Sequence, residues 1–312
     1  MCDVEANTTL SPTFRDALVS NGLLLPLGVE GVYGRSGVFE GIVEGVERLI
    51  TQEAGDEPTE VLRFPPVFSR AHYSRINHIH NFPDLLGSVH TFTGNERDHR
   101  AMVAHFEAGE PWTDDLVPSE LMLIPAACYP LYPTATGQLS AEGRMVDLRS
   151  FVFRHEPSPE PTRMQMFRQR EMVRLGTAEQ ALAHRDEWLE RGGALLRSMG
   201  LPVEAVVAND PFFGRGGRMS KASQREQTLK FELVVQVNDT GGPTAISSTN
   251  LHLDYFGKAF DIIGPDGVPA STACIGFGLE RVTLALLRHH GLDTTHWPLE
   301  LQRRLGIHGA NA

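Results

Sequence analysis

The sequence has 312 residues and a mass of 34.4 kDa, enough for one large domain or two ordinary domains with a substantial core. Hydrophobic residues make up 41% and charged residues 21%, and the longest apolar runs fall far short of the ~20 residues needed to cross a bilayer, so we expect a soluble protein without a membrane segment. The net charge of -11 opposes non-specific attraction to a polyphosphate such as tRNA.

The N-terminal stretch is polar. Residues 1–12 include Asp3 and Glu5 and lack the basic start and apolar stretch of a secretory signal, so we expect a flexible N-terminus and a cytoplasmic protein. The cysteines are too few for a disulfide framework, and in a reducing compartment they are expected to be thiols or metal ligands. They are Cys2, Cys128 and Cys274, of which Cys2 is expected to have no role.

The first clear elements are a helix and a strand. Apolar residues recur at helical spacing from Phe39 to Ile50, with glutamates and an arginine on the other side, which predicts an amphipathic helix. Gly55 and Pro58 then interrupt the chain before a short strand, Glu60–Phe64, which is stopped by two prolines.

Further strands are expected at 121–124, 150–154, 172–175, 231–237 and 270–275, and further helices at 178–199 and 279–289. Turns and loops, rather than regularly alternating helices, join consecutive strands. The sheet should therefore be mostly antiparallel and the fold α+β, not a Rossmann fold. We expect residues 13–312 to form a single domain with insertions.

One predicted strand ends in an arginine and a glutamate. Arg154 and Glu156 are two residues apart and so share a face, and the chain then returns through Phe167 into the next strand. Such a pair of strands would place a guanidinium for a phosphate, a carboxylate for an exocyclic amine and an aromatic ring for a base in one cleft. Taken alone, an arginine and a glutamate at this spacing are more often a surface ion pair.

A glycine turn near the C-terminus forms a second element. The segment Gly276–Arg281 passes from a strand through two glycines into an apolar helix, and glycines let a ligand approach the backbone closely. It does not fit a dinucleotide fingerprint, because a third glycine and the surrounding βαβ unit are missing. Taken alone, it is also compatible with a helix start whose Arg281 faces solvent.

In this order the elements resemble the motifs of class II aminoacyl-tRNA synthetases. Arg154 and Glu156 with Phe167 resemble motif 2, Gly276–Arg281 with its helix resembles motif 3, and the helix and strand that end at Pro66 resemble motif 1. The resemblance covers most of the chain from about Ser36 onward. It implies a class II synthetase-like catalytic core, with a mostly antiparallel sheet flanked by helices, and a homodimer formed through motif 1.

Within class II the likeness is to seryl-tRNA synthetases, through Gln169–Val173 and Ile246–Ser248. A seryl-type synthetase carries a long N-terminal coiled-coil arm that grips tRNA, and we expect no tRNA-binding arm here because the chain has no heptads to form it. Cores of this kind resemble the amino acid:[carrier protein] ligases of bacteria. The resemblance implies ATP-dependent activation of glycine or alanine to an aminoacyl-adenylate and transfer to a phosphopantetheinylated carrier protein, with no tRNA as partner.

The resemblance also implies a zinc ion held by Cys128, Glu171 and Cys274. Zinc accepts thiolate and carboxylate ligands, and three protein ligands with an open fourth position describe a substrate-binding site. The α-amine of the amino acid would fill that position. Without the motifs, two distant cysteines are more often buried core thiols.

The roles implied for ATP binding divide over motifs 2 and 3. Arg154 is expected to steady the α-phosphate, and Arg163 and Arg281 the distal phosphates of a bent nucleotide. Phe167 is expected to stack on adenine, and Glu156 to accept from its amine. The other expected ATP contacts are Met164, Lys230, Ala245, Ile246, Ser247 and Ser248.

One position departs from the seryl pattern, which has a glutamate for magnesium before Ile-Ser-Ser. This chain has Ala245 there, so we expect Glu232 on the preceding strand, or ATP phosphates and water, to complete the Mg²⁺ shell. Lys230 is expected to neutralise phosphate. Glu232 and Lys230 equally fit an exposed strand face.

Two basic runs are candidate docking surfaces for an acidic carrier protein, and either also fits an ordinary solvated surface. One run consists of Arg215, Arg218, Lys221, Arg225 and Lys230, and the other of Arg63, Arg70, His72, Arg75, His78 and His80, with Tyr73 and Phe82 interleaved. Two other functions stay open, an armless seryl-type aminoacyl-tRNA synthetase and a non-catalytic protein that binds amino acid or nucleotide.

Overall fold

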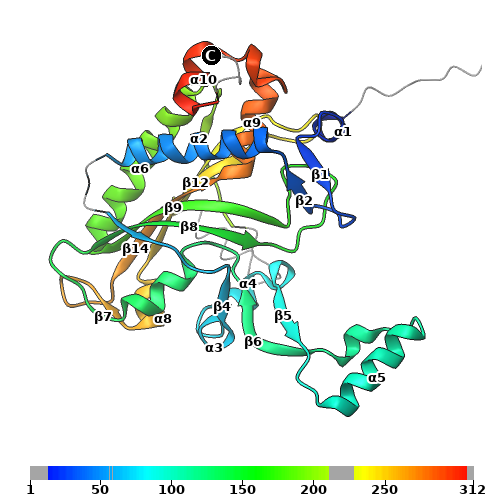
Figure 1. Ribbon diagram of the computed structural model, residues 1–312. Coiled ribbons are helices and arrows are strands. Elements are labelled where there is room, and N and C mark those ends of the chain that lie inside the picture. Colours follow the sequence, from blue (N-terminus) through cyan, green and yellow to red (C-terminus); the bar gives the residue numbers. More distant parts are fainter. Residues whose placement is uncertain (1–12, 56, 58, 211–227, 308–312) are drawn as a thin grey trace, which may run out of the picture.

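The computed structural model describes residues 13–307 except 56, 58 and 211–227 (Figure 1). At its centre is a seven-stranded sheet in which every neighbouring pair of strands is antiparallel except the last. In sheet order the strands are β10 (Glu204–Val207), β11 (Lys230–Val235), β12 (Thr244–Leu253), β14 (Ser271–Gly278), β9 (Met166–Gly176), β8 (Arg144–Phe153) and β3 (Glu60–Leu62). The predicted α+β class with a mostly antiparallel sheet is confirmed.

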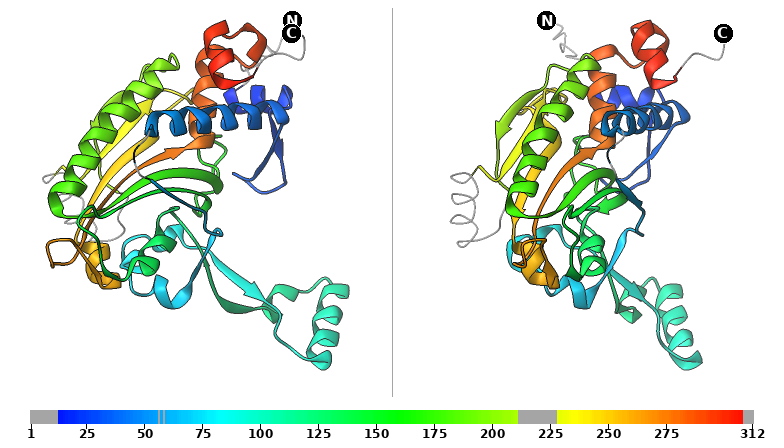
Figure 2. Two further views of the ribbon diagram at one scale, coloured as in Figure 1. Left: turned by 60° about the vertical axis from the view of Figure 1, so that its left-hand side comes forward. Right: turned by 90° about the vertical axis from the view of Figure 1, so that its left-hand side faces the viewer.

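Helices cover one face of this sheet, as Figures 1 and 2 show. They are α6 (Ala178–Ser198) and α9 (Leu279–His290) directly on the strands, α2 (Gly37–Ala54) across both helices, and α10 (Leu299–Leu305) against α2. Successive side chains of β14 point to opposite faces of the sheet. Ile275 and Phe277 pack toward Gly192 of α6, whereas Cys274 and Gly276 point to the opposite face.

The helix predicted from the motif 1 pattern is α2. Its apolar residues from Phe39 to Ile50 are buried, as the helical spacing requires. The Ser36 hydroxyl accepts a hydrogen bond from the Phe39 amide and caps the first turn. Gly55 ends the helix with φ of 63°, a conformation that favours glycine.

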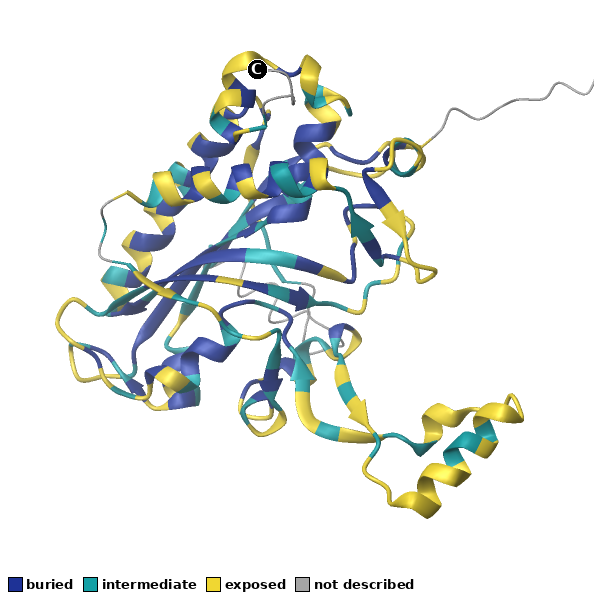
Figure 3. Cartoon of the chain, viewed as in Figure 1, coloured by how far each residue is buried: buried dark blue, intermediate teal, exposed yellow. Residues whose placement is uncertain are grey.

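A small arm interrupts the chain between motifs 1 and 2. It is a three-stranded sheet with a helix at its tip, built from β4 (Val67–Ser69), β5 (Ser88–Thr91), α5 (Glu96–Glu107) and β6 (Val117–Leu123). The helix projects from the body and buries none of its residues (Figure 3). Of this arm, the sequence pattern predicts only the end of β6.

The remaining elements are short. A hairpin of β1 (Leu24–Pro26) and β2 (Tyr33–Arg35) follows α1 (Phe14–Ser20), and β7 (Gly137–Gln138) pairs with β13 (Ile262–Ile263). The other helical turns are α3 (Arg70–Tyr73), α4 (His78–Asn81), α8 (Tyr255–Phe260), η1 (Pro83–Leu85), η2 (Trp112–Asp115), η3 (Tyr129–Ala135) and η4 (Thr294–His296). No helix in the described part of the chain is both long and apolar enough to span a membrane.

A buried ion-pair network ties motif 2 to motif 3. Arg168 of β9 lies 2.7 Å from Glu280 of α9 and 2.6 Å from Glu40 of α2, and Glu280 also accepts from the Arg168 amide at 2.6 Å. Glu280 is 1% exposed, so this pairing is shielded from water. The network fixes the first turn of α9 and hence the position of Arg281.

Several expectations need correction or lie outside the described residues. The strand predicted at 150–154 begins at Arg144, and the one predicted at 172–175 begins at Met166, so the polar residues before Glu171 belong to the strand. The second basic run is not a free cationic face, because Arg70 and Arg75 pair with carboxylates and His78 and Tyr73 are buried. The flexible N-terminus, Cys2 and residues 215–225 of the first basic run lie outside the described residues.

Candidate active site

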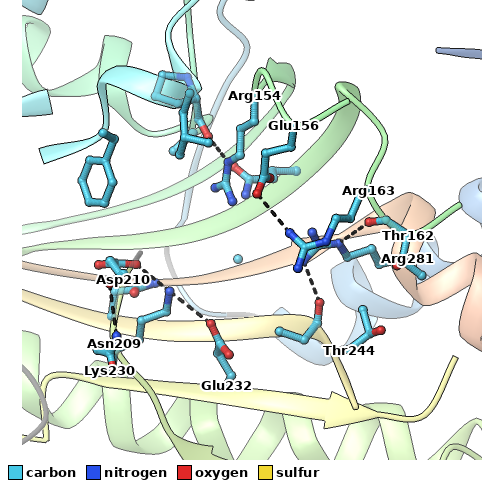
Figure 4. A pocket seen from close by; sticks show the side chains of 18 of the residues that line it. Arg154, Glu156, Thr162, Arg163, Asn209, Asp210, Lys230, Glu232, Thr244 and Arg281 are labelled. Atoms are coloured by element: carbon cyan, nitrogen blue, oxygen red, sulfur yellow. Dashed lines mark hydrogen bonds and ion pairs between the residues drawn. The ribbon is translucent and has the colours of Figure 1, made fainter. Parts of the chain in front are cut away.

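A cavity of about 620 Å³ opens on the face of the sheet that the helices leave free, and Figure 4 shows it from close by. Its walls come from β9, β11, β12 and β14, from the loop that follows β8, and from the segments 78–85 and 125–129. Predicted site residues that line it are Cys128, Arg154, Glu156, Arg163, Glu171, Lys230, Glu232, Ala245, Cys274 and Arg281.

Arg154 stands just beyond the end of β8. Its Nε donates to the Pro125 carbonyl at 3.0 Å, and its guanidinium lies over the ring of Phe167, 5.6 Å from the centroid. A planar cation held by a carbonyl and an aromatic face keeps most of its donors free for a ligand.

Arg281 approaches the same ring from motif 3. Its Nε donates to the Thr162 carbonyl at 2.8 Å and its Nη1 to the Ala245 carbonyl at 3.0 Å, while its guanidinium lies 5.8 Å from the Phe167 centroid. Burial and the neighbouring Arg154 charge lower the pKa of Arg281 to about 10, so it stays a cation at neutral pH. Two cations thus converge on one aromatic ring.

Glu156 and Arg163 form the outer lip of the cavity. Arg163 Nη1 lies 3.0 Å from Glu156 Oε1, and Arg163 Nε lies 3.5 Å from Glu160 Oε2 (Figure 4). The Arg163 side chain is 50% exposed, so the pairing is partly screened by water and can be exchanged for a ligand.

Five of the predicted ATP contacts do not line this cavity. Met164, Phe167 and Ile246 are buried, and Ser247 donates its hydroxyl to the Gly276 carbonyl at 2.9 Å. Ser248 pairs in the sheet with Glu232 and Gly276 and so shares their face, where its hydroxyl accepts a hydrogen bond from Asn250 at 3.4 Å. A base could stack on Phe167 only after a guanidinium had moved off the ring.

Lys230 lies between two carboxylates at the opposite side of the cavity (Figure 4). Its Nζ is 2.6 Å from Asp210 Oδ1 and 3.2 Å from Glu232 Oε1. Although burial opposes the charged form, the two carboxylates raise the pKa of Lys230. The exposed strand face that the sequence left open is instead a charge triad in which Lys230 is buried and the two carboxylates are partly exposed.

The three predicted zinc ligands come together at the inner end of the cavity. Cys128 and Cys274 interact with each other, which raises the pKa of the Cys128 thiol and lowers that of the Cys274 thiol. Cys128 also interacts with Glu171. Burial raises the pKa of Glu171 to about 8, and its Oε1 accepts from the Ala127 amide at 2.9 Å. Its Oε2 is buried and has no hydrogen-bond partner.

This donor set is adjacent but not preassembled. Among the described residues, no group of three His, Cys, Asp or Glu side chains already has the arrangement of a metal site. The chemistry of the donors fits zinc, and the orphaned Glu171 oxygen is the kind of atom that a metal ion would satisfy.

The sequence analysis did not single out five other cavity residues as site residues. They are His78, Asp210, Asn250, His252 and Phe256. Asn250 and His252 continue β12 beyond Ser248 in alternate positions, so a longer predicted strand could have found them. His78 stood in a proposed basic run, yet it is buried, burial lowers its pKa to about 4, and its Nε2 has no partner.

Comparisons with known proteins first define the class. The chain matches no protein-family model. Its fold matches M. kandleri SerRS, solved with A. aeolicus tRNASec, with a TM-score of 0.80 at 20% identity over 94% of this chain and 60% of that one. Prolyl-tRNA synthetase from Cryptosporidium parvum matches with a TM-score of 0.66 at 12% identity, over 89% and 52%. The protein therefore has the fold of a class II aminoacyl-tRNA synthetase.

Curated relatives then define the family. Amino acid–[acyl-carrier-protein] ligase 2 of Bradyrhizobium diazoefficiens is 41% identical over 309 residues, which cover 97% of this chain and 92% of the relative. Ligase 1 of the same organism is 42% identical over 95% and 92%. The type-2 serine–tRNA ligase of Methanopyrus kandleri is 23% identical over 86% of this chain and 54% of the relative. The chain belongs to the amino acid–[acyl-carrier-protein] ligase family, and it is a ligase.

Proposed function

We propose that this protein activates a small amino acid, glycine or alanine, with ATP and transfers it to the phosphopantetheine thiol of a carrier protein. The observation that carries the proposal is the convergence of Arg154, Arg281 and the Cys128–Glu171–Cys274 cluster on one cavity. The two relatives above 40% identity, both named amino acid–[acyl-carrier-protein] ligases, support the same reaction.

In the first step the amino-acid carboxylate attacks the α-phosphorus of ATP, and pyrophosphate leaves. Arg154 steadies the α-phosphate and offsets the charge that develops there, because its donors are free of any carboxylate among the described contacts. Arg163 and Arg281 hold the distal phosphates. For Arg163 this means exchanging its bond to Glu156 for a bond to phosphate.

The nucleotide base is assigned to the other part of motif 2. Phe167 stacks on adenine once Arg281 moves outward, and Glu156, released from Arg163, accepts from the adenine amine. Ala245 and Ser248 face the nucleotide, and the buried Met164, Ile246 and Ser247 support it from behind. For this movement Arg281 would give up its hydrogen bond to the Ala245 carbonyl.

Magnesium enters with ATP. Glu232 is the carboxylate available to Mg²⁺ in place of the glutamate missing at Ala245. Lys230, held beside it by Asp210 and Glu232, neutralises phosphate charge.

We propose that Cys128, Glu171 and Cys274 hold one zinc ion per subunit. A zinc ion there would bind the α-amine of the amino acid and leave its carboxylate directed at Arg154. Such a zinc ion would select amino acids with a free α-amine, but it would not distinguish one side chain from another. A pocket that excludes one more methylene discriminates by roughly 1–3 kcal/mol, so serine should be a weak substrate.

In the second step the carrier thiol attacks the carbonyl of the adenylate. A sulfur–carbon bond forms, the bond between that carbon and the phosphate oxygen breaks, and AMP leaves with the electron pair while the thiol proton is lost. No side-chain nucleophile of this chain is required. We further propose that residues 13–312 act as one catalytic domain, that the protein is a homodimer and that tRNA is not a partner.

One alternative has an observation in its favour. The type-2 serine–tRNA ligase of M. kandleri aligns with 86% of this chain, so charging of tRNA is the second candidate. The net charge of -11 argues against it, because phosphate contacts need local positive charge.

The decisive experiment is ATP–pyrophosphate exchange with each amino acid in turn, on protein assayed for zinc. Mass spectrometry of a phosphopantetheinylated carrier protein and of tRNA follows. Exchange with glycine or alanine, and a mass increase on the carrier alone, would support the proposal. Charging of tRNA alone would establish the alternative, and no exchange with any amino acid would point to a binding protein.

A further inference from the structure

Two side chains of β12 face the sulfur of Cys274 from the neighbouring strand. His252 Nε2 and Asn250 Nδ2 each lie 3.7 Å from Cys274 Sγ, within reach of a hydrogen bond to sulfur. Asn250 is the direct pairing partner of Cys274 in the sheet, and His252 lies two residues further on the same face. Cys274 therefore has two polar neighbours that are not among the predicted metal ligands.

The backbone of β12 is irregular on both sides of His252. The pairing of β12 with β14 shifts register between Leu251 and Leu253, and Leu253 has φ of 53°, in the left-handed region that residues other than glycine seldom adopt. Bulges of this kind redirect a side chain beside an active site.

The imidazole is held on its remaining sides. His252 Nδ1 lies 3.0 Å from Thr272 Oγ1, and the ring meets Phe256 edge to face at 5.1 Å. Phe256 in turn stacks on Tyr132 at 3.7 Å with an interplanar angle of 7°. The ring thus cannot turn away from the sulfur without breaking the Thr272 bond and this packing.

We propose that His252, anchored by Thr272 and assisted by Asn250, is a positioning residue that holds the Cys274 sulfur in place as a metal ligand. This inference rests on the proposed zinc site. A hydrogen bond from His252 orients the thiolate and relieves part of the negative charge that two thiolates and a carboxylate concentrate there. His252 itself does not bind the metal.

The test uses substitutions that keep the ring packing and remove the nitrogen. His252→Phe retains an aromatic ring against Phe256 but cannot donate a hydrogen bond to the sulfur. We therefore expect the zinc affinity to fall about 10–100-fold, as measured by chelator competition. His252→Gln restores an N–H donor and should recover part of the loss. Thr272→Val removes the anchor alone and should give a smaller loss in the same direction.

The matched control is His78→Phe, the same substitution at a histidine that lines the same cavity and contacts Tyr129 rather than sulfur. Its zinc affinity should equal that of the unaltered protein. The KM for the amino acid should rise in His252→Phe while the KM for ATP stays constant, which a general loss of fold would not produce.

Cobalt-loaded protein separates positioning from direct ligation. If His252 positions the sulfur, the thiolate-to-cobalt absorption of His252→Phe shifts while the number of ligands is retained. Unchanged zinc affinity in His252→Phe, or the loss of a nitrogen ligand from the cobalt site, would overturn the inference. If the unaltered protein binds no zinc, the proposed zinc site fails first, and the inference about His252 fails with it.

Discussion

At the scale of single residues, the hydrogen-bond and ion-pair partners of an arginine indicate whether it has a structural role or a ligand-binding role. Arg168 and Arg170 pair with the buried carboxylates of Glu280 and Asp147, each at 2.7 Å, so their charges are neutralised within the fold. Arg154 and Arg281 hydrogen bond only to backbone carbonyls among the described contacts and form no ion pair there. A partly buried cation without an ion pair is costly for folding, and an anionic ligand in the cavity would supply the counter-charge.

This contrast gives the first prediction. Arg154→Ala removes a cation that the fold does not use for an ion pair, so pyrophosphate exchange should fall by about 10²–10³-fold, as for the loss of one oxyanion donor. The midpoint of thermal unfolding should hardly change. The control is Arg149→Ala on the same strand, whose partner Glu47 lies outside the cavity, and its exchange rate should be normal. A fully active Arg154→Ala would refute the assigned role.

A second residue-scale prediction concerns pH. His184 of α6 is 4% exposed, its Nε2 bonds the Met172 carbonyl at 3.0 Å, and burial lowers its pKa from 6.5 to about 4. Between those two values the unfolded chain binds a proton that the folded chain does not, so stability decreases as the pH falls through that window. The full effect is on the order of 3 kcal/mol.

His184→Gln should flatten this dependence, because glutamine can keep a hydrogen bond to the carbonyl but cannot take up the proton. Chemical denaturation of both proteins at a series of pH values from 7 to 4 would measure the difference in slope. His80→Gln, at an exposed position, is the control and should follow the unaltered protein. Parallel curves for His184→Gln and the unaltered protein would contradict the burial argument.

At the scale of elements, two glycines of α2 make opposite predictions within one helix. A Cβ at Gly45 would lie 2.5 Å from the Leu305 carbonyl oxygen and 2.9 Å from its Cα, so Gly45→Ala should push α10 away and destabilise the protein by roughly 1–3 kcal/mol. At Gly41 the nearest atom is an Ile307 methyl at 3.8 Å. Gly41→Ala should therefore stabilise the helix by up to about 1 kcal/mol.

Thermal unfolding of the two variants would test the packing of α10 on α2. Both variants replace glycine by alanine in the same helix, so they differ only in what surrounds the added methyl group. Equal shifts in the same direction would mean that α10 does not contact the helix as described.

The elements found from sequence are those with strong local patterns. The spacing from Phe39 to Ile50 predicts α2, and the strand around Cys274 was placed within a few residues. The strand before Arg154 was found, but it begins at Arg144 rather than at Ser150. The arm around α5 was missed because its helix is rich in charged residues and buries none of its residues. Strand ends were missed where charged residues such as Arg168 and Arg170 are neutralised by partners far away in the sequence.

At the scale of the whole molecule, the cavity depends on contacts that no local pattern encodes. Lys230 meets Asp210, and Cys128 meets Cys274, across separations that only the sheet order determines. The resemblance supplied the ligand set, and composition or spacing alone could not. His78 was assigned to a basic docking surface and His252 escaped notice, because nothing in the sequence around them shows that the fold places both beside one cavity.

The open edge of the seven-stranded sheet bears on assembly. β3 pairs only with β8 in the described part of the chain, and Val61 at its centre is 60% exposed. An unprotected edge with an apolar residue favours pairing with another chain. Since β3 and α2 are the elements that resemble the class II dimer motif, we expect a second copy of this chain to cover them.

Light scattering on the unaltered protein should therefore give twice the 34.4 kDa of one chain. Val61→Asp places a charge in that contact and should shift the mass toward the monomer at low micromolar concentration, because a buried unpaired carboxylate is strongly disfavoured. Leu299→Asp is the matched control, since Leu299 is 74% exposed on α10, away from this edge, and its mass should stay that of a dimer. A monomeric mass for the unaltered protein would exclude the homodimer, and a dimeric Val61→Asp would place the interface on another surface.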